Sequence, residues 1–198
     1  GRVDRALSDW GDSTPGYGYV LGMYAFGLEE NGRYQEAEAL GRQSVELNPQ
    51  DAWGVHSVTH VMEMTGRAEE GIEWLESTLP GWGSSTMKLH NWWHALLLYI
   101  DLGDTDTALE LYDTRLVDDE RVDAEALADR VSALARFALL DVDVGDRWPV
   151  LAKLWEPMMF DARSPFNDLH ALLTFHYSNL GDLAQALVKC VRSEYDRA

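Results

Sequence analysis

The sequence predicts an all-α fold, a solenoid of about five antiparallel helix pairs, on three observations. First, glycines that can end a helix recur at intervals of 34, 37, 42 and 36 residues along the 198-residue chain. They are Gly32, Gly66, Gly103, Gly145 and Gly181. Second, a small residue follows four of these glycines at the fifth position, as Ala37, Gly71, Ala108 and Ala186. Third, Pro49 and Asp51 separate the first repeat from the next.

Each of these residue types has a physical reason to stand where it does. A glycine adopts the left-handed backbone conformation that ends many helices, so we expect each of the five to end a helix. The small residue lets the following helix approach its neighbour closely. Pro49 cannot continue a helix, and Asp51 can cap the next one. Helical hairpins of this size bury little on their own, so they stack on one another.

The helices follow in order from these breaks. The expected pairs are 17–31 with 34–47, 51–65 with 68–78, 87–102 with 105–116, 123–143 with 147–156, and 166–180 with 182–196. The expected repeat units are 17–49, 51–79, 87–118, 123–157 and 166–197, within one domain that spans 1–198. The fourth unit departs from the pattern, because Trp148 and Pro149 stand where a small residue is expected. The segments 81–85 and 160–165 are expected to be loops.

The spacing and the residue pattern resemble the tetratricopeptide repeat (TPR), most specifically in the first, second, third and fifth units. Several stretches are also similar to the tetratricopeptide repeat protein 38 family. They are 22–30 (GMYAFGLEE), 51–67 (DAWGVHSVTHVMEMTGR), 90–94 (HNWWH), 101–104 (DLGD), 112–113 and 168–171. This resemblance covers nearly the whole chain and implies a right-handed α-solenoid. Because members of that family extend further toward the N-terminus, it also implies that the chain is the C-terminal portion of a longer protein.

Composition excludes several classes of protein. The chain carries 16 basic and 34 acidic side chains, and its formal net charge of −18 repels nucleic-acid backbones. A hydrophobic fraction of 46% with eight tryptophans excludes a disordered chain. The single cysteine, Cys190, excludes an internal disulfide and a cysteine-based zinc cluster. No apolar run approaches the roughly 20 residues that span a bilayer. We therefore expect a cytoplasmic protein that binds neither nucleic acid nor membrane.

The first helix of each pair is expected to line the concave surface of the solenoid. In the second unit, Val55, Val58 and Met62 share one face of that helix and predict its core side. Polar and aromatic side chains gather on the opposite face. They are Trp53, His56, His60 and Glu63, which lie within an arc of about 80°.

The third and first units repeat this arrangement. In the third unit Trp92, Leu96 and Tyr99 are expected in the core. In the first unit Gly22 is expected to leave room for a ligand. The candidate ligand-binding residues of the three units are Phe26, Glu29, Trp53, His56, His60, Glu63, His90, Trp93, His94 and Asp101.

The four histidines admit three interpretations. In the first, they bond one another, indoles and carboxylates and only hold helices together. In the second, they contact a ligand directly. In the third, the spacing of four residues within each pair presents two imidazoles on one face, as metal sites require. Because no His-Glu-x-x-His motif occurs, we assign no metal and no cofactor at this stage. Two histidine pairs beside carboxylates are expected to titrate near neutral pH.

Two functions from different classes remain open. One is a non-enzymatic binding module whose acidic groove takes a peptide segment or a small, preferably cationic ligand. The other is an enzyme in which the clustered histidines act as general acids and bases or as metal ligands on a small molecule. The exposed end of a solenoid also needs a cover. We expect the first helix pair to be covered by the segment Arg2–Trp10, by a second copy of the chain, or by a preceding N-terminal region.

Overall fold

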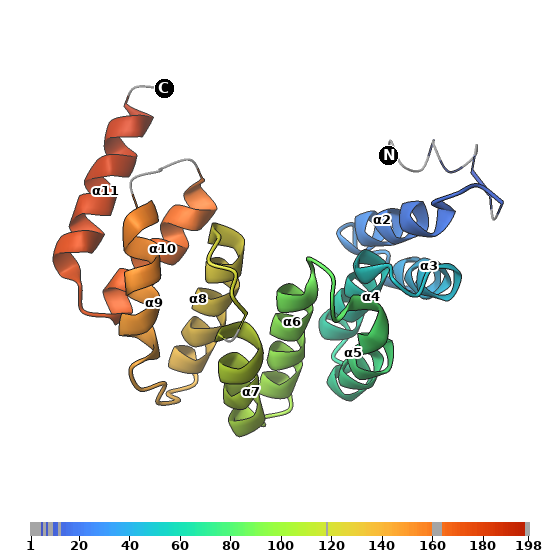
Figure 1. Cartoon of the computed structure of the whole chain (residues 1–198), viewed down its shortest axis with the longest axis horizontal. Helices are drawn as coiled ribbons and strands as arrows, with labels where there is room; N and C mark the ends of the chain where they lie inside the picture. The colour runs from blue at the N-terminus through green and yellow to red at the C-terminus, as the bar shows by residue number, and fades with distance from the viewer. Residues whose placement is uncertain are drawn as a thin grey trace. The chain divides into compact units, whose positions relative to one another are not determined.

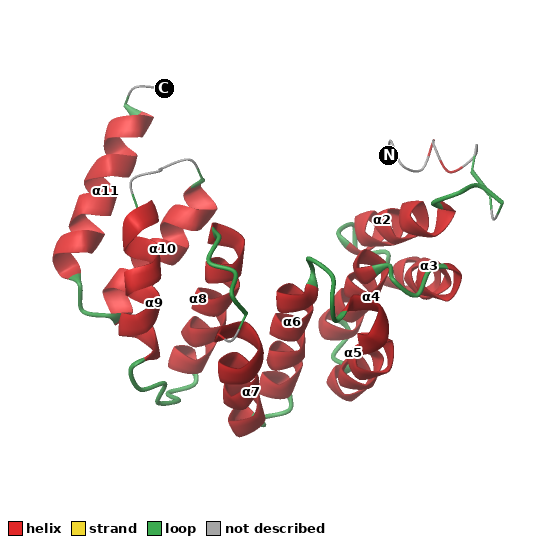
Figure 2. Cartoon of the chain, in the orientation of Figure 1, coloured by secondary structure: helices red, strands yellow, loops and turns green. Residues whose placement is uncertain are grey.

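All regular secondary structure in the described part of the chain is helical (Figures 1 and 2). The computed structural model describes residues 5, 7, 10–11, 13–117, 119–159 and 164–196. Among these residues, no helix combines the length and the apolar character needed to cross a membrane. The chain divides into two compact units, Gly1–Asp104 and Thr105–Ala198, which are described separately. The single domain over 1–198 and its five repeat boundaries stay predictions.

The first unit contains two complete helix pairs and the first helix of a third. Its helices are α2 (Tyr17–Glu29), α3 (Tyr34–Leu47), α4 (Ala52–Met64), α5 (Ala68–Trp82) and α6 (Lys88–Asp101). Helix α2 packs against α3 and α4, α4 against α5, and α5 against α6. This chain of neighbours is the stacking that the repeat pattern predicts.

The second unit continues the helical pattern with two departures from regular α-helix. Its elements are α7 (Thr105–Leu111), the π-helix η1 (Tyr112–Val117), α8 (Ala124–Leu139), α9 (Arg147–Trp155), the 3₁₀-helix η2 (Glu156–Met158), α10 (Pro165–Tyr177) and α11 (Gly181–Tyr195). The expected helix over 105–116 is therefore an α-helix that continues into a π-helix. Helix α10 packs against α8, α9 and α11.

A glycine ends the first helix of the pair in the first three units, but not in the fourth and fifth. Gly32, Gly66 and Gly103 have positive φ angles of 72°, 69° and 77° at the ends of α2, α4 and α6. In the fifth unit Asn179 takes the left-handed conformation instead, with φ 57°, and Gly181 begins α11. In the fourth unit Asp141 does the same after α8, with φ 56°. Asn and Asp tolerate this conformation better than other residues with a side chain.

The expected loop over 81–85 is wrong at its start. Helix α5 continues through Trp82, whose fully buried indole donates a hydrogen bond to the carbonyl oxygen of Leu75 over 3.0 Å. Gly81 belongs to the same helix, and a Cβ there would clash with the carbonyl oxygen of Pro49. Of the second expected loop, residues 160–163 lie outside the described residues, and Pro165 already belongs to α10.

The core side of α4 is confirmed. Val55 and Val58 are fully buried, and Met62 is 1% exposed. On α6, Leu96 is fully buried, whereas Trp92 is half-buried and packs edge-on against Trp82 with ring centroids 5.2 Å apart. These buried side chains define the core sides of α4 and α6. The opposite faces of the two helices carry the histidines.

The outer face of α2 carries exposed apolar side chains. Tyr19 and Met23 are 50% and 57% exposed. The expectation that Arg2–Trp10 covers the first helix pair falls mostly on positions outside the described residues.

Candidate functional site

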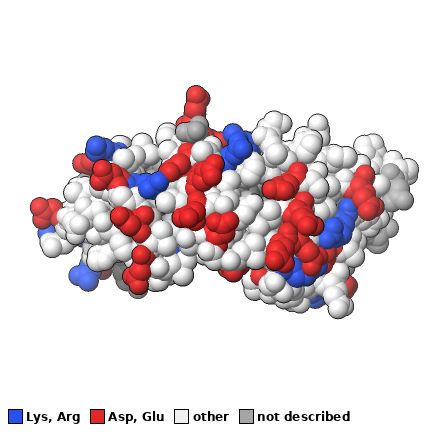
Figure 3. Space-filling model, turned by 90° about the horizontal axis from the view of Figure 1, so that it is seen from below, with Lys and Arg blue, Asp and Glu red and all other residues white. Residues whose placement is uncertain are grey.

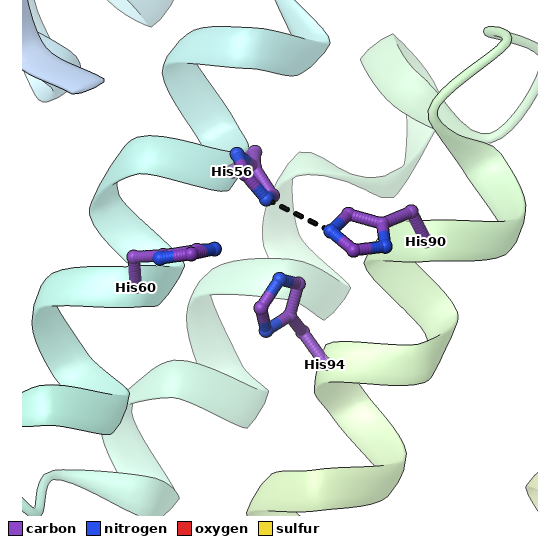
Figure 4. Close-up of side chains that lie close together, drawn as sticks. All are labelled: His56, His60, His90 and His94. Atoms are coloured by element: carbon purple, nitrogen blue, oxygen red, sulfur yellow. Dashed lines mark hydrogen bonds between the residues drawn. The ribbon is translucent and has the colours of Figure 1, made fainter. Parts of the chain in front are cut away.

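Helices α4 and α6 bring the four predicted histidines into one cluster. His56 and His60 come from α4, and His90 and His94 from α6 (Figure 4). The ring centroids within the pairs lie 4.3 Å and 4.8 Å apart. Across the helices, the ring of His56 lies 5.0 Å from that of His90, and the ring of His60 lies 4.6 Å from that of His94. One ring nitrogen from each of the four lies within 4.8 Å of the other three.

Burial and hydrogen bonds hold these rings in place. His56 and His94 are only 3% and 2% exposed, and His60 and His90 are half-buried. The Nε2 atoms of His56 and His90 lie 3.1 Å apart, so one ring donates its N–H and the other accepts. This bond joins α4 directly to α6.

Two glutamates face the outer sides of the cluster. The Nδ1 atom of His94 donates a hydrogen bond to Glu63 Oε2 over 2.8 Å. The Nδ1 atom of His60 lies 3.4 Å from Oε2 of Glu29, a carboxylate on α2 that is 6% exposed. Because an ionised carboxylate only accepts hydrogen bonds, the Nδ1 atom of His94 carries the proton and its Nε2 atom is left with a lone pair.

Burial dominates the proton equilibria of the cluster. It lowers the pKa of His56 well below 6.5, and the nearby rings of His94, His60 and His90 lower it further. Burial also lowers the pKa of His60, although the carboxylate of Glu63 opposes this. The expectation of titration near neutral pH is therefore wrong for His56, because desolvation of the imidazolium outweighs the nearby acids. Burial, followed by Glu30 and Glu63, raises the pKa of Glu29.

Aromatic side chains surround the histidines. The ring of Trp93 stacks on His90 with centroids 5.1 Å apart and planes 13° apart. The ring of Phe26 lies 5.4 Å from that of His56 and 5.8 Å from that of Trp53. Phe26 from α2 thus closes the cluster on the side away from α6.

The predicted site residues fall into two layers. The buried layer contains Glu29, His56 and His94. The half-buried and exposed layer contains Phe26, Trp53, His60, Glu63, His90, Trp93 and Asp101. Trp53 is 47% exposed, and Asp101 is exposed at the end of α6. A role of these residues in binding a ligand stays a prediction.

The expectation that Gly22 leaves room for a ligand is wrong. A Cβ at Gly22 would clash with the carboxylate of Asp51 and lie 3.1 Å from the backbone nitrogen of Gly54. Helix α4 instead fills the space that a side chain at Gly22 would occupy. Ser57 on α4 donates a hydrogen bond to the Gly22 carbonyl over 3.3 Å.

The second unit holds a cavity of about 540 Å³ that sequence reasoning missed. Its lining is Tyr112, Asp113, Val117, Asp119, Glu120, Val122, Arg130, Asp146, Arg147, Val150, Leu151 and Leu154. Arg147 donates to both carboxylate oxygens of Asp113, and Arg130 donates to the backbone oxygens of Leu116 and Asp119. The cavity lies beside the π-helix η1, whose geometry a periodicity of 3.6 residues does not reveal. Only the irregular spacing of the fourth unit signals it in the sequence.

Comparison with solved structures identifies the fold. The TPR protein YrrB, described as having an unusual peptide-binding site, matches with a TM-score of 0.52 and 16% identity over 96% of this chain and 91% of that one. A Podospora anserina putative kinesin light chain with nearly identical TPR-like repeats matches with a TM-score of 0.60 and 16% identity, over 91% and 96%. A Parabacteroides merdae tetratricopeptide repeat protein matches with a TM-score of 0.54 and 18% identity, over 91% and 68%. The chain has a TPR-like fold.

At these identities the likeness shows the fold alone. No family model matches the chain, so membership of the tetratricopeptide repeat protein 38 family stays a prediction. TPR-like repeat folds are in general protein-binding modules, because stacked helix pairs present an extended surface. Which ligand this chain binds depends on the side chains of the chain itself and not on its fold.

Proposed function

We propose that this TPR-like chain is a non-enzymatic binding module that takes a cationic peptide segment on its first unit. The observation that carries the proposal is the exposed indole of Trp53, which is 47% exposed on a helix that also carries Glu63. An exposed tryptophan suits a lysine or arginine side chain because its ring face attracts a cation, and Glu63, ten residues further along α4, offers a carboxylate to a second basic side chain.

The charge of the chain supports a cationic partner. The net charge is −18, and acidic side chains outnumber basic ones on the face drawn in Figure 3. Such a field raises the rate at which a positively charged segment meets the surface and disfavours acidic competitors. Asp101 adds an exposed acid at the end of α6.

The likeness to YrrB supports the class of ligand only. That protein is described as having an unusual peptide-binding site. In this chain, the peptide would contact the outer layer of Trp53, Glu63, Trp93 and Asp101, while His56 and His94 lie beneath it.

The alternative is an enzyme, which the convergence of His94 and Glu63 favours. A carboxylate that accepts from Nδ1 over 2.8 Å orients the ring and leaves Nε2 able to take a proton. The 2% exposure of His94 places its ring below the surface, where a peptide lying on the outer layer does not reach it. A substrate would have to enter the cluster itself.

Fluorescence anisotropy with labelled peptides of matched length tests the proposal. Lysine- or arginine-containing peptides are expected to bind, with affinity that falls as salt rises, and glutamate-containing peptides are not. Trp53→Ala is expected to weaken binding about tenfold, as for a residue at the centre of an interface. Phe166→Ala is the matched control, since Phe166 is 61% exposed in the second unit. The proposal would be contradicted if Trp53→Ala bound basic peptides as tightly as Phe166→Ala does. It would also be contradicted if acidic and basic peptides bound equally well.

A further inference from the structure

We propose that His56, His60, His90 and His94 form a binding site for one divalent transition-metal ion, Zn²⁺, which links α4 to α6. This site lies beneath the proposed peptide surface and shares Glu63 with it, but its four ligands are histidines, so it does not depend on the peptide.

The geometry brings four ligand nitrogens together in a way that suits tetrahedral coordination. Each helix supplies two histidines four residues apart, so both rings of a pair project from one face. The candidate ligand nitrogens all lie within 4.8 Å of one another. A Zn–N bond of 2.0–2.1 Å in a tetrahedron corresponds to about 3.3 Å between ligand nitrogens. The Nε2 atoms of His56 and His90 already lie 3.1 Å apart, and an ion at the centre would draw the remaining nitrogens in from within 4.8 Å.

The four rings also face one point. Figure 4 shows them turned toward a common centre between α4 and α6. The helices on which they stand are held by buried apolar contacts, including the fully buried Val58 and Leu96. The rings therefore meet on rigid elements, as a precise metal site requires.

Two carboxylates orient ligands in the way that metal sites commonly use. Glu63 accepts from Nδ1 of His94 over 2.8 Å, and Glu29 lies 3.4 Å from Nδ1 of His60. The hydrogen bond to Glu63 leaves Nε2 of His94 directed to the centre and makes that imidazole a stronger electron donor, and Glu29 adds a nearby negative charge behind His60. The two negative charges also offset the double positive charge of the ion in a buried place.

The cluster has a polar atom that its protein neighbours do not satisfy. Nδ1 of His56 is buried and has no hydrogen-bond partner within the described part of the chain. The hydrogen bond that this ring makes runs from its other nitrogen, Nε2, to His90. Coordination of an ion at Nε2 would replace that bond to a neutral imidazole with a stronger interaction, and Nδ1 would then carry the proton.

The donor set indicates the class of metal and its role. Imidazole nitrogens suit zinc, copper and nickel, whereas calcium and magnesium prefer oxygen. Four protein ligands complete a tetrahedral shell and leave no position for substrate, so the role is structural. The ion would cross-link the second and third helix pairs at the base of the proposed peptide surface.

Metal analysis of the full chain, purified without an affinity tag and stripped with a chelator, tests the site. After zinc is added and excess removed by dialysis, mass spectrometry is expected to find one Zn²⁺ per chain. Thermal unfolding is expected to shift upward as free Zn²⁺ rises, because the ion binds only the folded arrangement. His60→Ala and His94→Ala are each expected to weaken zinc binding at least about tenfold in a competition with a coloured chelator.

Three further variants separate this site from other zinc-binding groups. His176→Ala removes an exposed histidine of the second unit and is expected to change nothing. Glu30→Gln tests an alternative set of Glu29, Glu30 and His60 and is also expected to change nothing. Glu63→Gln should weaken zinc binding about 10- to 100-fold while leaving one zinc per chain at saturation, as a positioning residue does.

Cobalt substitution keeps the proposal testable if a histidine variant fails to fold, which circular dichroism would reveal. The unmodified protein with Co²⁺ is expected to show the strong visible absorption of a tetrahedral ion. The weak absorption of octahedral Co²⁺, or zinc binding that His60→Ala and His94→Ala leave unchanged, would overturn the proposal.

Discussion

At the scale of single residues, the contact between α2 and α4 depends on the absence of a side chain at Gly22. The Cβ of any other residue would clash with the buried carboxylate of Asp51 and approach the backbone of Gly54. Asp51 in turn accepts a hydrogen bond from the hydroxyl of Ser44 over 3.0 Å. The position that the sequence alone suggested as ligand space is thus a packing position, and it fixes how Phe26 and Glu29 stand against α4.

We predict that Gly22→Ala lowers the free energy of unfolding by about 1–3 kcal/mol, as overpacking does. Gly27→Ala is the matched control on the same helix, because its added Cβ meets no described atom within 4 Å. The control is expected to raise the free energy of unfolding by about 0.5–1 kcal/mol through helix propensity. Urea titrations followed by circular dichroism measure both, and a neutral Gly22→Ala would show that α2 does not approach α4 this closely.

A second prediction concerns Asn179, which ends α10 at a positive φ of 57°. Asn179→Gly is expected to raise the free energy of unfolding by about 0.5 kcal/mol, because glycine takes this conformation without steric cost. Ser178→Gly, one residue earlier at φ −85°, is expected to lower it by a similar amount. Thermal unfolding of the two variants should therefore move in opposite directions from the parent protein.

At the scale of helices, an ion-pair network joins α3 to the turn before α5. Arg67 donates to both carboxylate oxygens of Glu38, over 3.3 Å and 2.5 Å, and Arg42 pairs with the same carboxylate from one turn along α3. These hydrogen bonds, with the positive charges behind them, lower the pKa of Glu38 below 4.5. Two first-unit repeats are thus joined by charge as well as by apolar packing.

This network predicts a pH dependence with a definite sign. Because the folded state holds Glu38 ionised more strongly than the unfolded state, its contribution is complete above about pH 4.5 and is lost as pH falls through the lowered pKa. Glu38→Gln is expected to lower the free energy of unfolding by about 1 kcal/mol at pH 7. The difference from the parent protein should shrink in urea titrations at about pH 3. If the two proteins differed in free energy of unfolding by the same amount at pH 7 and at about pH 3, the charge of Glu38 would not be the cause of the destabilisation.

At the scale of the whole molecule, the charge imbalance acts against the compact fold. A net charge of −18 over 198 residues repels itself, and salt screens this repulsion. We predict that at pH 7 the melting temperature rises by several degrees when NaCl is raised from about 0.02 to 0.5 M, because the added salt shortens the Debye length and screens the repulsion. Near the sequence isoelectric point of about 4.5 the same change in salt should have much less effect. Differential scanning calorimetry at the two pH values compares them directly.

The candidate site shows where sequence reasoning reaches its limit. The spacing of His56 and His60, and of His90 and His94, was enough to place each pair on one helix face. The repeat pattern also predicted that both pairs line one groove, but not how closely the four rings meet, nor that burial lowers the pKa of His56. Those properties depend on the distance between α4 and α6, and the residue pattern of one helix does not specify that distance.

The helical architecture and the buried faces of the helices can be predicted from the amino-acid sequence alone. Regular glycines, small residues and apolar periodicity are local features, and local backbone preference decides where a helix ends and which side it buries. Only the tertiary structure decided which faces meet and how closely. It turned Gly22 from ligand space into a packing contact and opened a cavity beside η1. It also converted two separate histidine pairs into one cluster. Packing distances and burial arise from contacts between residues far apart in the chain, so a one-dimensional pattern leaves them open.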